Sequence, residues 1–154
     1  MISILTEAPN LTESPQAAAY LGYLLAFAIA TVTCLGAAWR ARSVAYAGTR
    51  RALVSFFSTS AAWAAAYVGF LLAESALWKH LFYQASLIVG FGTVFAWVWF
   101  CSAYSGRGLH RMRQVQWFGA AVFVAVTALK VTNPLHGLYY GLEPTGGAFG
   151  LVVT

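Results

Sequence analysis

Four apolar stretches separated by short polar connections constrain this chain more than any other feature. They cover about residues 16–39, 52–73, 81–104 and 115–131. A helix needs about 20 apolar residues to cross the hydrocarbon core of a bilayer. Only 8% of the residues are charged, against about 25% in a soluble domain. The sequence therefore predicts an all-α fold, an integral membrane bundle of four transmembrane helices.

The whole chain, residues 1–154, is expected to form a single membrane domain of a multi-pass protein in the cell membrane. Residues 1–15 form a polar tail without the basic residues of a signal peptide, and residues 132–154 form a loop or tail after the fourth span. This composition requires a lipid bilayer around the chain. It is also compatible with a homo-oligomer or with a membrane signalling partner.

The basic residues are concentrated in two of the connections. Lys79 and Lys130 stand apart from the rest. Seven arginines lie beside or within the connections after the first and third spans: Arg40, Arg42, Arg50, Arg51, Arg107, Arg111 and Arg113. Basic loop residues mark the cytoplasmic side, so both chain ends are predicted to lie outside. The net charge of +5 is thereby explained without nucleic acid as a partner.

Ionisable residues inside the spans are scarce. No Asp or Glu lies within the apolar stretches away from their ends, which argues against a proton pump. Lys130 is the only lysine in a span and stands near its outer end, where a long side chain is expected to reach the interface. That position argues against a retinal-type pigment. His80, His136, Glu74 and Glu143 show no metal-ligand spacing, so neither a metal nor a cofactor is predicted.

Aromatic residues recur at helical spacing in two spans and are candidates for a ligand site. Trp63 and Tyr67 share one face of the second span, and Trp97 and Tyr104 share a face of the third. Such stripes either line a ligand pocket or serve as packing and lipid contacts, and both interpretations stay open. The third span also has a pair of small residues four apart, Ser86 and Gly90, of the kind that lets membrane helices approach.

The segment TNPLHGLYY, residues 132–140, follows the fourth span. Pro134 cannot continue a helix, and the residue before a proline is biased away from helical conformation. The segment is therefore expected to stop the helix at the outer interface, with Asn133 in a structural role. His136 would either report external pH, because an unperturbed imidazole has a pKa near 6.5, or simply hydrogen-bond the loop.

From about Ala61 to Tyr140 the chain resembles the N-terminal seven-helix sensor region of membrane histidine kinases. The resemblance is carried by WAAAYVGFLLAES, WVWFCSAYSGRG and TNPLHGLYY in this order. It implies a membrane sensory module of histidine-kinase signal transduction, a two-component system, that perceives a stimulus or pairs with another signalling subunit. The chain departs from that pattern in ending at Thr154, in the expected outward loop, and in having no proline near Val94.

Kinase chemistry is not expected in this chain, which is predicted not to be an enzyme. His80, His110 and His136 are not followed by an acid, as a phosphoaccepting histidine of this class would be. No P-loop lysine is present either. The alternative function is a small oligomeric transporter or channel subunit for a neutral solute, whose polar stripe would come from the hydroxyls of the second span: Ser55, Ser58, Thr59 and Ser60.

Overall fold

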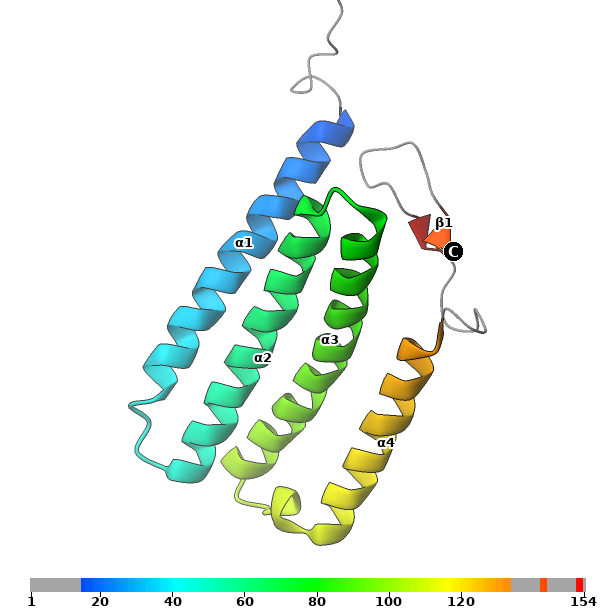
Figure 1. Ribbon diagram of the computed structural model, residues 1–154. Coiled ribbons are helices and arrows are strands. Elements are labelled where there is room, and N and C mark those ends of the chain that lie inside the picture. Colours follow the sequence, from blue (N-terminus) through cyan, green and yellow to red (C-terminus); the bar gives the residue numbers. More distant parts are fainter. Residues whose placement is uncertain (1–14, 134–141, 144–151, 154) are drawn as a thin grey trace, which may run out of the picture.

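The computed structural model describes residues 15–133, 142–143 and 152–153. Figure 1 shows four long helices that run alternately up and down. They are α1 (Pro15–Ala41), α2 (Ala47–Leu72), α3 (Ala76–Tyr104) and α4 (Arg113–Val131), with a short 3₁₀ helix η1 (Leu109–Arg111) before α4. All four long helices are long and apolar enough to cross a membrane. A two-residue antiparallel pair, β1 (Leu142–Glu143) with β2 (Val152–Val153), is the only strand pairing within the described ranges.

The helices extend beyond the predicted apolar stretches at most of their ends. α2 starts at Ala47 rather than near residue 52, and α3 starts at Ala76 rather than near residue 81. The predicted limits followed the apolar residues, whereas backbone hydrogen bonding continues into the polar connections. Ser75 helps α3 to begin there, because its side chain accepts a hydrogen bond from the backbone N–H of Trp78 and so caps the helix.

Close approach of small residues builds the packing of α2 against its neighbours. The residues of α2 that are fully buried are all alanines: Ala52, Ala61, Ala64 and Ala66. Two glycines lie directly against aromatic rings across the α2–α3 contact. A Cβ at Gly69 would lie 2.6 Å from Cδ1 of Phe82, and a Cβ at Gly90 would lie 2.9 Å from Cδ1 and Nε1 of Trp63. The two rings thus occupy space that only glycine leaves open.

The hydroxyl of Tyr20 ties α1 to the C-terminal end of α2. It donates a 2.7 Å hydrogen bond to the carbonyl of Leu71, in the last turn of α2, where carbonyls have no partner within the helix. We expect Tyr20→Phe to lower the free energy of unfolding by about 0.5–1 kcal/mol. Tyr23→Phe, at an exposed position of α1, is the matched control and should be neutral. Thermal melting in detergent compares them, and equal melting temperatures would show that this bond does not stabilise the fold.

The fourth helix packs on α3 but is displaced along it. Phe123 stacks on Phe91 with ring centroids 5.9 Å apart and meets Phe95 edge-on. The side chain of Lys130, one residue before the end of α4, reaches the backbone of Leu87. Leu87 follows the start of α3 by 11 residues, about 16 Å along the axis. Figure 1 likewise shows α4 ending well short of the upper end of α3.

Asn133, two residues beyond the end of α4, is only 3% exposed, because α4 ends partway along α3. The rest of the segment TNPLHGLYY lies outside the described residues, and its expected position at the outer interface stays a prediction. Hydropathy gave the length of the fourth span correctly, and did not give its axial position.

The connection between α3 and α4 is held by one buried hydroxyl and two glycines. Ser102 Oγ accepts a hydrogen bond from the backbone N–H of His110 at 3.0 Å and lies 3.1 Å from Nδ1 of the same residue. Gly106 and Gly108 have φ angles of +70° and +66°, in the left-handed region that glycine adopts without strain. These features turn the chain tightly, so α4 returns alongside α3.

Candidate functional site

Aromatic side chains from α1 and α2 form a layer partway through the bundle. Phe27 of α1 stacks on Tyr67 of α2 with ring centroids 4.7 Å apart and planes 7° from parallel. Phe27 also meets the edge of Trp63 at 6.1 Å, and Trp63 meets Tyr67 edge-on at 5.5 Å. Trp63 rests in turn on Gly90 of α3. Two of the predicted site residues, Trp63 and Tyr67, are therefore brought together.

A cavity of about 450 Å³ lies beside this layer, between α2, α3 and α4. Its volume falls in the range of about 300–1,000 Å³ that is usual for small-molecule sites. The described residues that line it combine aromatic, aliphatic, hydroxyl and cationic groups: Trp63, Tyr67, Ser86, Leu87, Gly90, Phe91, Thr93, Val94 and Lys130.

Lys130 is the charged residue of this lining, and its position contradicts the sequence prediction. Its side chain was expected to reach the interface, but it is only 5% exposed. Nζ donates a 2.8 Å hydrogen bond to the carbonyl of Leu87 and lies 5.0 Å from the centroid of the Phe91 ring, within cation–π range. Because α4 is displaced along α3, the end of α4 is a buried position. A lysine-linked chromophore was not expected because Lys130 was placed at the interface, and the buried position of Lys130 removes that reason.

The serine and threonine hydroxyls of the cavity lining are already engaged with their own helix. Ser86 Oγ is 1% exposed and donates to the carbonyl of Tyr83 at 2.7 Å. Thr93 Oγ1 donates to the carbonyl of Val89 at 3.0 Å. Their oxygens can still accept hydrogen bonds, but their protons are used. Lys130 and Tyr67 bring two further donor groups to the lining, and Lys130 donates to the carbonyl of Leu87.

The remaining predicted site residues lie elsewhere. Trp97 and Tyr104 are 52% and 76% exposed and do not line the cavity. Asn133 is buried beyond the end of α4. His136 lies outside the described residues. No group of three His, Cys, Asp or Glu residues suited to a metal occurs in the part of the chain searched.

Of the residues that line the cavity, only Trp63 and Tyr67 were predicted as site residues. Lys130 and Phe91 of the lining were missed, as was Phe27, which stacks on Tyr67. The signal for Lys130 was available, because an ionisable residue within a membrane span is by itself a candidate for function. The contribution of the two phenylalanines depends on which neighbouring helix each face meets, and the sequence does not contain that information directly.

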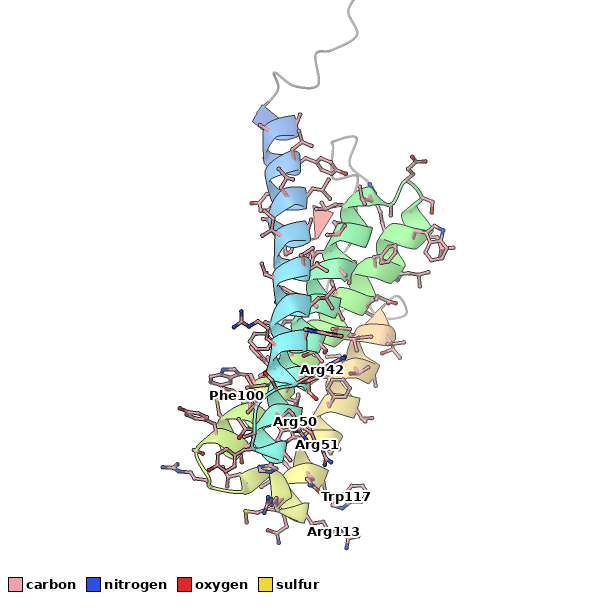
Figure 2. The ribbon with its side chains drawn as sticks, turned by 90° about the vertical axis from the view of Figure 1, so that its left-hand side faces the viewer. Arg42, Arg50, Arg51, Phe100, Arg113 and Trp117 are labelled. Atoms are coloured by element: carbon pink, nitrogen blue, oxygen red, sulfur yellow. The ribbon has the colours of Figure 1, made fainter. Side chains whose placement is uncertain are left out.

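The predicted arginines gather at one end of the bundle. The α1–α2 turn and the α3–α4 connection lie together at the lower end of Figure 1, opposite the α2–α3 turn. Figure 2 shows Arg42, Arg50, Arg51 and Arg113 at this end. A groove of about 410 Å³ there is lined by Arg42, Arg50, Arg51, Val54, Ser55 and Trp99. The predicted grouping of the basic connections at one end is thus confirmed.

The fold and this site define a class of protein: a helical membrane bundle with an aromatic-lined cavity and one basic end. The model of a family described as the N-terminal 7TM region of histidine kinase matches residues 23–154. The chain belongs to that family, which confirms the resemblance found in the sequence and extends it toward the N-terminus. The family is the membrane sensory input region of a histidine kinase and not its catalytic part. Neither a curated protein nor a solved structure matches the chain.

Proposed function

We propose that this chain perceives a stimulus within the membrane and passes it to histidine-kinase signalling, without kinase activity of its own. The observation that carries the proposal is the cavity between α2, α3 and α4, since it holds a buried lysine within a sensory input region. A molecule in that cavity contacts three helices at once, so its binding would change their relative positions. Relative movement of packed helices is a common means of transmitting a signal.

The transporter or channel alternative receives less support. A pore needs hydroxyls that face a shared polar path. The hydroxyl of Thr59 instead donates to carbonyls of its own helix, at Ser55 and Phe56, both at 3.0 Å. Ser60 does the same to Phe56 at 2.8 Å. Both hydroxyls are therefore satisfied without a solute.

The proposal includes an orientation, with the arginine-bearing end in the cytoplasm and both chain ends outside. We expect single cysteines at Ser43 and at Ser105, in a background with Cys34 and Cys101 replaced by alanine, to be labelled by a membrane-impermeant maleimide only after the cells are opened. A cysteine at Glu74, in the opposite turn, is the matched control and should be labelled on intact cells. Labelling of Ser43→Cys or Ser105→Cys from outside would overturn the orientation.

The sensory role itself is tested in the source organism by following phosphorylation of its response regulators. We compare the unaltered gene, an in-frame deletion and Lys130→Met, using phosphate-affinity gels under changes of external pH, osmolarity and added fatty acids. The deletion is expected to abolish one stimulus-dependent phosphorylation, and Lys130→Met to weaken it. Trp97→Phe, at an exposed position that does not itself line the cavity, should preserve it. Identical phosphorylation patterns in all strains would refute the proposed function.

A further inference from the structure

We propose that the groove at the arginine-bearing end of the bundle binds a phosphomonoester, whose phosphate group is held by the guanidinium groups of Arg42, Arg50 and Arg51. This groove shares no lining residue with the cavity between α2, α3 and α4, so the proposal is independent of the sensory role above. A soluble phosphate ester and a phospholipid headgroup present the same phosphate chemistry, and the experiment below distinguishes the two sources.

Separate parts of the chain bring the three arginines to one groove. Arg42 follows directly on the last residue of α1, and Arg50 and Arg51 are the fourth and fifth residues of α2. All three line the groove, and Trp99 of α3 contributes to the same lining. Figure 2 shows the three arginines at the end of the bundle where the α1–α2 turn lies. A ligand in the groove would therefore contact the α1–α2 turn, α2 and α3 together.

The positive charge of the groove has no acidic counterpart in the part of the chain that the structure describes. Only two described residues are acidic, Glu74 and Glu143. Glu74 lies in the α2–α3 turn, at the opposite end of the bundle (Figure 1), and Glu143 lies in β1. Three like charges around one groove repel one another. An anion between them replaces this repulsion with attraction, so the lining favours a negatively charged ligand.

The start of α2 adds to the positive potential at this end. The N-cap residue, Tyr46, makes no side-chain hydrogen bond to the helix, and the first turn contains no acidic residue. The first N–H groups of a helix lack partners within the helix, and the helix dipole places about half a positive charge there. Arg50 and Arg51 are unfavourable for the helix at this position, because cations stabilise the opposite end. A bound anion offsets that cost.

The guanidinium groups favour a phosphate monoester over other anions. A guanidinium presents a planar fork of N–H donors that pairs with phosphate oxygens through two parallel hydrogen bonds. Arg42 lies over the ring of Trp39, 4.8 Å from its centroid, and this contact leaves donors for a ligand because a guanidinium has five. A phosphomonoester carries a charge of about −1.5 to −2 at pH 7, which matches several arginines better than a carboxylate or a phosphodiester does.

The remaining lining suits the organic part of an ester. The groove has a volume of about 410 Å³, within the range of about 300–1,000 Å³ that is usual for small-molecule sites. Beside the arginines it offers the side chains of Val54 and Trp99 and the hydroxyl of Ser55. The ring of Trp99 lies 6.5 Å from that of His110, which Ser102 ties to α3 through the backbone N–H. The indole is thus supported from behind as one wall of the site.

The test is the melting temperature of the purified full chain in neutral detergent micelles. The protein is titrated with glycerol phosphate and, separately, with dioctanoyl phosphatidic acid, which carries the same phosphomonoester on a lipid. A ligand that binds the folded state raises the melting temperature as its concentration passes the Kd. We expect a saturable rise with at least one of the two compounds. Each of Arg50→Gln and Arg51→Gln should weaken that affinity about tenfold, because a charged hydrogen bond is lost.

The two compounds also identify the source of the phosphate. A response to glycerol phosphate assigns the groove to soluble phosphate esters, and a response to phosphatidic acid alone assigns it to a phospholipid headgroup. Dioctanoyl phosphatidylglycerol, a diester with a single negative charge on the same acyl chains, should bind more weakly than phosphatidic acid. Equal affinity for the two lipids would contradict the preference for a monoester.

Arg113→Gln is the matched control, because Arg113 lies at the same end of the bundle (Figure 2) but does not line the groove. It should leave the affinity nearly unchanged. Val54→Trp narrows the groove without removing a charge and should weaken binding, which keeps the test decisive if an arginine variant fails to fold. Equal losses in Arg113→Gln and Arg51→Gln would show that diffuse positive charge holds the ligand, and would overturn the site. No melting response to either compound, or an affinity unaffected by Val54→Trp, would overturn it as well.

Discussion

Replacing Gly90 by leucine is expected to lower the free energy of unfolding by about 1–3 kcal/mol, the usual cost of forcing a larger side chain into a packed contact. Even the first added atom would lie 2.9 Å from two ring atoms of Trp63, closer than non-bonded atoms tolerate. Either α2 and α3 separate, or the indole leaves the cavity. Both changes would lower the melting temperature in detergent and shift the tryptophan emission.

A glycine in open space supplies the control. Gly36 in α1 has no atom within 4 Å of an added Cβ, so Gly36→Leu should be neutral or slightly stabilising, since leucine favours a helix more than glycine does. The cause is checked by a double-mutant cycle. Trp63→Ala removes the obstructing ring and should restore most of the stability lost in Gly90→Leu. A Gly90→Leu protein that melts with the wild type, or that Trp63→Ala fails to rescue, would contradict this account.

The helical, membrane-spanning fold could be predicted because its cause is local. A bilayer requires every backbone polar group to be bonded within the span, so an apolar stretch of sufficient length becomes a helix whatever its neighbours are. The grouping of the arginines at one end could be predicted from the number of spans, since each span reverses the direction of the chain. The Ser86–Gly90 pair was also informative, because Gly90 indeed marks a close contact between α2 and α3.

The depth of Lys130 could not be predicted, because hydropathy contains no information on how far one helix is displaced along another. That displacement is fixed by side-chain packing. Phe123 stacks on Phe91, and the open side of Gly119 receives the ring of Phe95. These contacts place the end of α4 beside Leu87 and carry Lys130 into the bundle. Lys130, which the sequence predicted to lie at the interface, is thus a buried cation.

The aromatic stripes show the same limit of local reasoning. Trp63 with Tyr67, four residues apart, and Trp97 with Tyr104, seven residues apart, each share a face of their helix, yet of these two pairs only the first lines the cavity. The difference is the neighbour. Trp63 and Tyr67 meet Phe27 of α1, and Trp63 also lies against Gly90 of α3. Trp97 and Tyr104 stay exposed, and Tyr104 contacts Phe100 of its own helix.

The second large effect is expected at Asn133, where Asn133→Ala should lower the free energy of unfolding by about 1–3 kcal/mol. The last carbonyls of any helix lack partners within the helix, and Asn133, beyond the end of α4, is only 3% exposed. A buried amide side chain, able to donate and to accept, suits the end of α4 for that reason. Since the amide does not titrate, the loss should be the same at pH 5 and pH 8.

Thr132→Ala is the matched control for this loss, because it removes a polar side chain from the neighbouring position. Thr132 is exposed, and its hydroxyl bonds the carbonyl of Ala128, which the backbone N–H of Thr132 also reaches. The carbonyl of Ala128 keeps its hydrogen bond from the backbone N–H when the hydroxyl is removed, so the melting temperature should change little.

His136→Gln, four residues beyond Thr132, should also leave stability almost unchanged, and should remove any pH dependence of conformation between about pH 5 and 8. Melting temperatures and tryptophan emission of the three variants across that range decide the matter. If Asn133→Ala melts together with Thr132→Ala, the buried amide does not stabilise the end of α4. If His136→Gln instead melts as early as Asn133→Ala and the wild type shows no response to pH, His136 is a structural residue of the same segment.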